Sequence, residues 1–185
     1  MIEAIGAPQL RPPLENAFAA LVRSITFQQL AGRAAAAIHG RFAANFADGV
    51  TAEGVLALPE TAFRTAGLSA AKTASIRDLA AKAADGTVPL DRIEECSDDE
   101  IVERLSLVRG IGRWTAEMFL IFQLRRPDVW PVQDLGVRKG YGLAHRMTAL
   151  PTPKELMALG DVYRPFRTVA AWYCWRAAET VLPEG

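Results

Sequence analysis

Two neighbouring stretches of the sequence contain the residues best suited to chemistry, and a turn with two glycines opens the first. Residues 107–116 read LVRGIGRWTA, so Gly110 and Gly112 allow a tight turn with accessible backbone N–H groups. Amides at the start of a helix bind phosphate because the helix N-terminus carries partial positive charge. Arg109 and Arg113 flank the turn and add full charges. This pattern predicts sequence-independent contact with a sugar-phosphate backbone; an ordinary helix–helix turn is the alternative.

The second stretch, residues 129–140 (VWPVQDLGVRKG), carries one carboxylate, Asp134. A loop stiffened by proline precedes it and a predicted helix follows it, so we expect Asp134 to be an N-cap whose charged form the helix amides favour. A fixed carboxylate can stabilise a developing cation and orient or deprotonate water. A purely capping aspartate is the alternative. The functional interpretation is favoured by spacing, because Asp134 lies one helix and one loop after the glycine turn.

The elements that must position these residues read as helices joined by short turns, without strand-like alternation. Ser69, Ser97 and Thr152 are the expected N-caps, and Ser97 forms a capping-box pattern with Glu100. Helices are expected over 14–30, 34–46, 52–57, 60–66, 70–84, 97–105, 113–124, 134–145, 153–159 and 165–181. The predicted fold class is therefore all-α, with about nine or ten helices.

The net charge of the whole chain argues against a nucleic-acid partner, whereas the local charge of one segment favours such a partner. The 185 residues include 21 basic and 21 acidic side chains, so the formal net charge is zero, whereas nucleic-acid-binding proteins usually carry a basic excess. The balance differs between segments, because residues 1–100 hold 9 basic and 13 acidic side chains and residues 101–146 hold 8 and 4. The basic stretch is the one that contains both the glycine turn and Asp134.

Other compositional features exclude several classes of protein. Half of the residues are hydrophobic and 23% are charged, which excludes a disordered chain. The cysteines, Cys96 and Cys174, are far apart, as are the two histidines, so we expect reduced thiols and no metal site. The N-terminus lacks the pattern of a signal peptide, and no apolar run approaches the ~20 residues of a membrane span.

The combination LVRGIGRWTAEMFL followed by PVQDLGVRKG resembles the helix-hairpin-helix DNA glycosylase superfamily. Two outer segments, SITFQQLAGRAAAAIHGRF and PFRTVAAWYCWR, are similar to its 3-methyladenine DNA glycosylase II family of alkylation-repair enzymes, particularly the compact members. The resemblance covers roughly residues 14–180.

This resemblance implies an all-α fold with two helical lobes around a cleft and a helix-hairpin-helix motif, in a single glycosylase unit over residues 1–185. One lobe is expected to comprise about 1–40 and 130–185. The other is expected to comprise about 41–129, including the hairpin at 107–116.

The resemblance further implies that Asp134 is the catalytic carboxylate of a DNA glycosylase. Such an enzyme flips alkylated purines of the 3-methyladenine or 7-methylguanine type, hydrolyses the N-glycosidic bond and leaves an abasic site for base excision repair. Alkylation makes the purine cationic and a good leaving group, so the species that needs stabilisation is the oxocarbenium-like sugar. Bifunctional members carry a lysine where this sequence has Trp114, so a monofunctional enzyme without lyase activity is expected.

A cationic base is attracted to aromatic faces, and the resemblance places Trp114 in the lesion pocket. Trp172 from the last helix is the second expected pocket residue. Met118 stands where family members often have an aromatic side chain, so the pocket is expected to be less aromatic there. We expect Trp175, one turn beyond Trp172, to belong to the core.

Base flipping leaves a hole in the duplex, and the family fills it with a side chain from the loop after the first long helix. The matching residues here are Gln29, our preferred wedge, and Leu30. A merely polar helix end is the alternative for this loop. The residues expected to contact the DNA backbone are Arg109, Gly110, Gly112, Arg113 and Lys139.

The expected partner is double-stranded DNA containing alkylated bases, and the chain is expected to act as a monomer without a membrane partner. No cofactor is expected, although relatives hold a monovalent cation at the hairpin carbonyls. The expected location is the cytoplasm with the nucleoid in a prokaryote, or the nucleus in a eukaryote.

Two other functions fit parts of this pattern. A non-catalytic helix-hairpin-helix DNA-binding module would need Arg109, Arg113, Arg138 and Lys139, but not Asp134 or an aromatic pocket. A glycosylase for another lesion, such as an oxidised or deaminated base, would keep the same carboxylate. Neither the preferred lesion nor the oligomeric state follows from the sequence.

Overall fold

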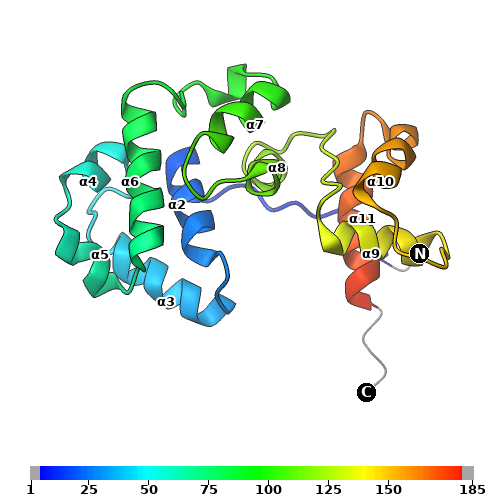
Figure 1. Cartoon of the computed structure of the whole chain (residues 1–185), viewed down its shortest axis with the longest axis horizontal. Coiled ribbons are helices and arrows are strands. Elements are labelled where there is room, and N and C mark those ends of the chain that lie inside the picture. Colours follow the sequence, from blue (N-terminus) through cyan, green and yellow to red (C-terminus); the bar gives the residue numbers. More distant parts are fainter. Residues whose placement is uncertain (1–4, 181–185) are drawn as a thin grey trace. The chain divides into compact units, whose positions relative to one another are not determined.

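The computed structural model describes residues 5–180, and every regular element within that range is a helix. This confirms the predicted all-α fold class. The elements shown in Figure 1 are α2 (Ala17–Phe27), α3 (Gly32–Ala43), α4 (Ala52–Ala57), α5 (Glu60–Ala66), α6 (Ala70–Ala84), η1 (Ile93–Glu95), α7 (Asp98–Ser106), α8 (Arg113–Phe122), α9 (Leu135–Ala144), α10 (Pro153–Leu159), η2 (Asp161–Tyr163) and α11 (Arg167–Thr180).

Local capping sets many of the helix starts. The side chains of Ser69, Ser97 and Thr152 each accept a hydrogen bond from the backbone N–H three residues later. Ser97 and Glu100 complete the predicted capping box, and Thr152 forms a second one with Glu155. The helices with the predicted bounds are α4, α5, α6 and α10.

Other helix ends differ from the predicted ones. Helix α2 stops at Phe27 rather than near residue 30, because Gln28 leaves the helical conformation with ψ of 132° and Gln29 then has a left-handed backbone with φ of 57°. Helix α11 starts at Arg167 rather than at Pro165, and the carboxylate of Asp128 accepts the backbone N–H at its first residue.

The chain divides into two compact units. Unit 1 comprises Met1–Pro12 and Leu120–Gly185, and unit 2 comprises Pro13–Phe119. Helix α8 starts in unit 2 and continues into unit 1.

This division corrects the expected lobes, because residues 13–40 belong with the segment that follows them rather than with residues 130–185. The physical reason is the packing of the first two long helices. Helix α2 contacts α3 and α6, and α3 contacts α5, so both helices bury their apolar faces inside unit 2.

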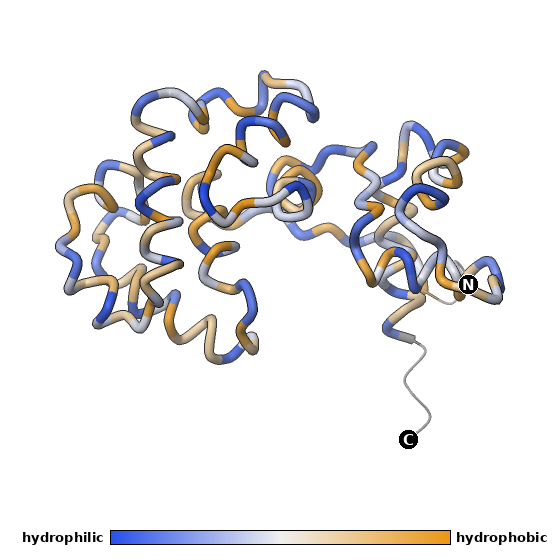
Figure 2. Tube along the Cα trace, viewed as in Figure 1, coloured by the Kyte–Doolittle hydropathy of each residue, from blue (hydrophilic) through white to orange (hydrophobic). Residues whose placement is uncertain are grey.

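Unit 2 has a core to which α2 and α6 contribute buried side chains. Leu21, Val22 and Ile25 of α2 are buried, as are Ile76 and Leu79 of α6. Figure 2 shows both hydrophobic and hydrophilic positions along these helices, as expected for helices that pack one face on a core.

Unit 1 centres on the contact between α9 and α11. Its buried cluster includes Trp130, Val137, Leu156 and Ala171. The Trp130 indole Nε1 donates to the backbone oxygen of Leu156 at 2.8 Å, so this buried polar group is satisfied. The loop that carries Asp134 therefore begins from an anchored tryptophan.

Candidate active site

The glycine turn forms a hairpin between α7 and α8. The Ile111 backbone N–H donates to the Val108 oxygen at 3.0 Å, and the Ile111 side chain is buried. Gly110 has φ of +78°, and a Cβ added there would lie 2.7 Å from Ser75 Oγ on α6. Both the backbone conformation and the close approach require glycine at this position.

The carboxylate of Asp78 on α6 forms a hydrogen bond with the backbone of the hairpin. Asp78 Oδ2 accepts the backbone N–H of Arg109 at 2.7 Å, and Asp78 Oδ1 accepts the ammonium of Lys82 at 2.5 Å. Burial raises the pKa of Asp78, but these bonds and charges outweigh it and leave the pKa below its usual value. The Arg109 side chain is exposed, as a phosphate contact requires.

Arg113 opens α8 and is only partly available to a phosphate. Its Nε donates to Glu117 Oε1 at 3.0 Å, one turn along the same helix. About half of the Arg113 side chain is exposed, whereas that of Glu117 is buried. Gly112 is exposed beside it, so the accessible backbone of the hairpin lies next to this arginine.

The loop predicted to supply the wedge lies in the same unit as the hairpin. Gln29 and Leu30 are both exposed there. The neighbouring Gln28 side chain points elsewhere, because its Nε2 donates to the Gly110 oxygen of the hairpin at 2.9 Å. Lys72 of α6 donates its ammonium to the backbone oxygens of Thr26 and Gln28, the latter at 2.8 Å.

Asp134 is the N-cap of α9, as predicted. Its Oδ1 accepts the backbone N–H of Val137 at 2.8 Å. The same oxygen accepts the indole Nε1–H of Trp175 from α11 at 2.9 Å. Two donors from different elements therefore fix the orientation of this carboxylate.

The sequence interpretation of Trp175 as a core residue missed this contact. Trp175 is half-buried, and its ring stacks on Phe122 with centroids 5.6 Å apart and an interplanar angle of 26°. Room for the indole comes from Gly136, where a Cβ would lie 2.8 Å from Trp175 Cδ1. The DLG pattern directly after the loop was the one available signal, because a glycine two residues past Asp134 leaves space beside the carboxylate.

An open pocket of about 820 Å³ lies on unit 1 beside this pair. Phe122, Trp172 and Trp175 form its aromatic lining, and residues 9–11 contribute to its wall. The Arg176 guanidinium lies over the Trp172 ring, 5.6 Å from its centroid. Trp172 therefore lines this pocket, whereas Trp175 is the tryptophan that contacts the carboxylate.

The other predicted pocket residues lie on α8. Trp114 is exposed and Met118 is half-buried, and their spacing of four residues places them on one face of the helix. Both belong to unit 2, whereas Trp172 belongs to unit 1, so their assignment to a shared lesion pocket remains a prediction. Lys139 is exposed on α9 of unit 1, as its predicted role requires.

A salt-bridge cluster anchors the start of the loop that leads to Asp134. Asp128 accepts Arg167 Nε at 2.7 Å and Nη2 at 2.9 Å, and it accepts Arg164 Nη1 at 3.0 Å. The side-chain bond from Arg167 is the largest cause that holds the pKa of Asp128 below its usual value. This cluster ties the loop to the first turn of α11, the helix that carries Trp175.

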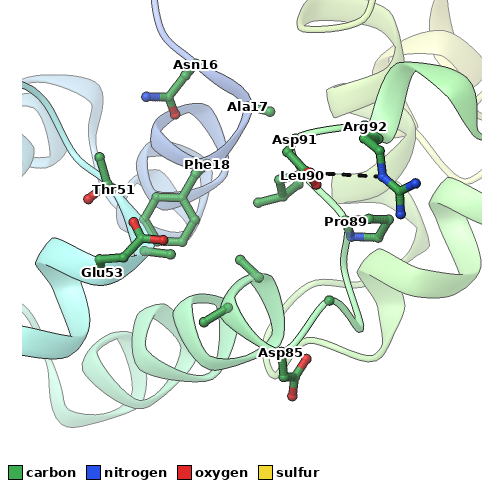
Figure 3. Close-up of a pocket in the computed structure, with 14 residues that line it drawn as sticks. Asn16, Ala17, Phe18, Thr51, Glu53, Asp85, Pro89, Leu90, Asp91 and Arg92 are labelled. Atoms are coloured by element: carbon green, nitrogen blue, oxygen red, sulfur yellow. Dashed lines mark ion pairs between the residues drawn. The ribbon is translucent and has the colours of Figure 1, made fainter.

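A second open pocket, of about 660 Å³, lies on unit 2 (Figure 3) and contains none of the predicted site residues. Glu53, Asp85 and Asp91 place three carboxylates around it, and Arg92 is 4.0 Å from Asp91. Because these carboxylates would repel phosphate, we do not expect this pocket to bind DNA, in contrast to the hairpin.

Within residues 5–180, no group of three or more His, Cys, Asp or Glu side chains could hold a metal ion. Over the same residues, no helix is long and apolar enough to cross a membrane. Cys96 and Cys174 do not form a disulfide, and burial raises the pKa of the Cys174 thiol to about 12.

The hairpin does offer carbonyl oxygens, which are suitable ligands for a hard cation, but those of Val108 and Gly110 already accept N–H donors.

Comparisons with known proteins identify the family of this chain. Residues 22–165 match the family described as HhH-GPD superfamily base excision DNA repair protein. The chain is 39% identical over 162 residues to DNA-3-methyladenine glycosylase 1 of Schizosaccharomyces pombe, covering 86% of this chain and 71% of that protein.

Two solved structures share the fold at similar identity. The S. pombe 3-methyladenine DNA glycosylase in complex with abasic DNA is 36% identical, with a TM-score of 0.81 and coverage of 96% of this chain and 89% of that one. A DNA-3-methyladenine glycosidase from Bacillus halodurans is 35% identical, with a TM-score of 0.88 and coverage of 97% and 82%.

Proposed function

Because the chain belongs to the HhH-GPD superfamily of base excision DNA repair proteins, we propose that it is a monofunctional DNA glycosylase that excises alkylated purines. The observation that carries the proposal is the fixed carboxylate of Asp134, held by Val137 and Trp175 beside an aromatic pocket. The 3-methyladenine glycosylases with which it shares more than a third of its residues support the substrate class.

In the proposed reaction, the bond between C1′ and the purine nitrogen breaks, and its electron pair leaves with the base. Alkylation gives the purine a positive charge and makes it a good leaving group. The protein therefore needs only to stabilise the oxocarbenium-like sugar. Asp134 supplies the negative charge for that purpose, because its fixed position avoids reorganisation during the reaction. Water then adds to C1′ and gives up one proton, for which Asp134 is the acceptor.

The products are a free base and an abasic site in an unbroken strand. A lyase would need an amine to form a Schiff base with C1′, but the hairpin helix has Trp114 where bifunctional relatives carry that lysine. The same side chain, with Trp172 and Met118, is proposed to contact the flipped base.

DNA binding is assigned to the exposed parts of unit 2. The amides of Gly110 and Gly112 and the side chains of Arg109 and Arg113 would contact phosphates, and Gln29 or Leu30 would fill the gap left by the flipped base. We further propose that Lys139 contributes a phosphate contact, that the enzyme acts as a monomer on double-stranded DNA, and that it works in the compartment that holds the chromosome. If a monovalent cation binds, the carbonyls of Val108 and Gly110 would hold it through their second lone pairs.

The direct test is incubation with alkylated duplex DNA followed by chromatography of the released bases. The wild-type protein should release 3-methyladenine or 7-methylguanine, and Asp134→Asn should release neither while its affinity for DNA changes little. Asp48→Asn, at an exposed position away from the predicted site, is the matched control and should keep full activity. Unchanged excision by Asp134→Asn would refute the mechanism.

The same experiment separates the enzyme from a non-catalytic DNA-binding module. A module would bind the duplex without releasing any base, and Asp134→Asn would then alter neither property. Substrates with an oxidised or a deaminated base, run in parallel, identify a glycosylase for another lesion.

A further inference from the structure

The loop at residues 28–31, between α2 and α3, has a strained backbone. Gln29 adopts φ of +57°, which lies in the left-handed region that residues with a Cβ rarely occupy. Such a conformation persists only where its surroundings hold it in place. The neighbours of this loop therefore show what fixes the side chains of Gln29 and Leu30.

Lys72 holds the loop from one side. Its ammonium donates to the backbone oxygens of Thr26 and Gln28, which lie at the C-terminal end of α2 and the start of the loop. Carbonyls at a helix end have no partner within the helix, and a cation there is also favoured by the helix dipole. Burial lowers the pKa of Lys72, so the ammonium gives up part of its hydration to reach these oxygens.

The hairpin holds the same loop from the other side. Gln28 Nε2 donates to the Gly110 oxygen at 2.9 Å, across 82 residues of sequence. A hydrogen bond therefore joins the loop expected to enter the duplex directly to the turn expected to bind phosphate. All of these residues belong to unit 2.

Helix α6 connects the two elements a second time. Lys72, Ser75 and Asp78 are spaced three residues apart and so follow one face of the helix. The first binds the loop, the second lies against Gly110, and the third accepts the Arg109 backbone N–H. One face of one helix thus contacts both the loop and the hairpin.

We propose that Lys72 is a positioning residue for base flipping, which together with Gln28 holds the loop in register with the hairpin so that Gln29 or Leu30 enters the duplex at a set distance from the bound phosphates. The inference rests on the proposed function. A loop fixed in advance loses no conformational freedom on binding, so more of the binding free energy remains to unstack the damaged base.

A simpler role for Lys72 would be to cap α2 and nothing more. Both roles predict some loss of stability when the ammonium is removed. They differ in what happens on DNA, because a positioning residue acts only through the wedge side chain. The decisive measurement is therefore the coupling between Lys72 and Gln29 in binding to flipped and unflipped DNA.

The first experiment compares Lys72→Met with Arg64→Met, which removes the same charge from an exposed site on α5. Affinity is measured for an undamaged duplex and for a duplex with an abasic site, with 2-aminopurine beside the site to report unstacking. Lys72→Met should weaken abasic-site binding about tenfold and reduce the fluorescence change, while undamaged-duplex affinity stays within twofold. Arg64→Met should match the wild type. Equal losses on both duplexes, or no loss on either, would overturn the proposal.

The second experiment combines Lys72→Met with Gln29→Ala/Leu30→Ala. If Lys72 acts through the wedge, the combined variant should lose no more abasic-site affinity than the wedge variant alone. A loss equal to the product of the separate losses would show an independent structural role and contradict the proposal. So would a wedge variant that binds abasic-site DNA like the wild type.

Gln28→Ala provides the same test if Lys72→Met fails to fold, because it removes the bond to Gly110 and keeps the ammonium in place. It should show the same preference for loss on the abasic-site duplex. Base release by the wild-type protein, measured separately, distinguishes failure of this proposal from failure of the proposed function.

Discussion

The indole Nε1 of Trp175 donates to Oδ1 of Asp134 at 2.9 Å, which joins two residues 41 positions apart in the sequence. The Val137 backbone N–H donates to the same oxygen from within α9. One of these donors is local and belongs to the cap, whereas the other depends on how α11 packs against α9. The orientation of the proposed catalytic carboxylate therefore depends on the tertiary structure of unit 1.

Replacing this indole tests the contribution of the tertiary donor. Trp175→Phe keeps an aromatic ring against Phe122 but removes the N–H, so single-turnover base release should slow about tenfold, the scale of one hydrogen bond to a charged group. Affinity for abasic-site DNA should change little. Tyr173→Phe, which removes a donor on the same helix that bonds to Gly6, is the control. Equal rates for Trp175→Phe and the wild type would show that the Val137 amide alone suffices.

The left-handed backbone at Gln29 predicts opposite changes in stability and activity. Gln29→Gly relieves the backbone strain, so the protein should be more stable than Gln29→Ala by about 1 kcal/mol in denaturant unfolding. Both variants lack the wedge side chain, so both should flip a damaged base less efficiently than the wild type. A glycine variant less stable than the alanine variant would contradict the assigned strain.

The salt-bridge cluster around Asp128 predicts a pH-dependent contribution to stability. The folded-state pKa of Asp128 is lowered, so its stabilisation is present above the unfolded pKa near 4 and is lost as the pH falls through the folded value. Asp128→Asn should lower the free energy of unfolding by about 1–2 kcal/mol at pH 7. The difference from the wild type should shrink below about pH 4 in chemical denaturation. A difference independent of pH would point to lost packing instead.

The exposed side chain of Arg109 predicts a specific effect of salt. Arg109→Ala should weaken binding to duplexes of any sequence by a similar factor and reduce the slope of log K against log salt by about one. Arg64→Ala, away from the hairpin, should leave the slope unchanged. Because the net charge is zero, the wild-type slope itself should be small, with modest affinity for undamaged DNA. Strong dependence of the loss on base sequence would contradict a phosphate contact.

Features determined by neighbouring residues could be predicted from the sequence. The caps at Ser69, Ser97, Thr152 and Asp134 depend on contacts within four residues, and the structure confirms all of them.

Features that depend on distant segments could not be predicted in this way. The sequence assigned Trp172 to the pocket and Trp175 to the core, because only the packing of α11 against α9 decides which of them reaches Asp134. The division into units depends on α2 packing against α6, which the sequence pattern of α2 does not specify. The contacts of Lys72 with the loop are likewise invisible in a sequence that shows only a lysine in the first turn of a helix.

The absence of a side chain at Gly136 has a consequence for changing this enzyme by mutation. A Cβ at this position would lie 2.8 Å from Trp175 Cδ1 and 3.1 Å from Asp134 Oδ1, so any larger residue would push the indole and the carboxylate apart. Neither Trp175 nor Asp134 would itself be mutated. An inactive variant could therefore retain every chemical group of the proposed reaction. Screens for loss of function that consider only those groups would overlook position 136, where steric volume alone controls the alignment.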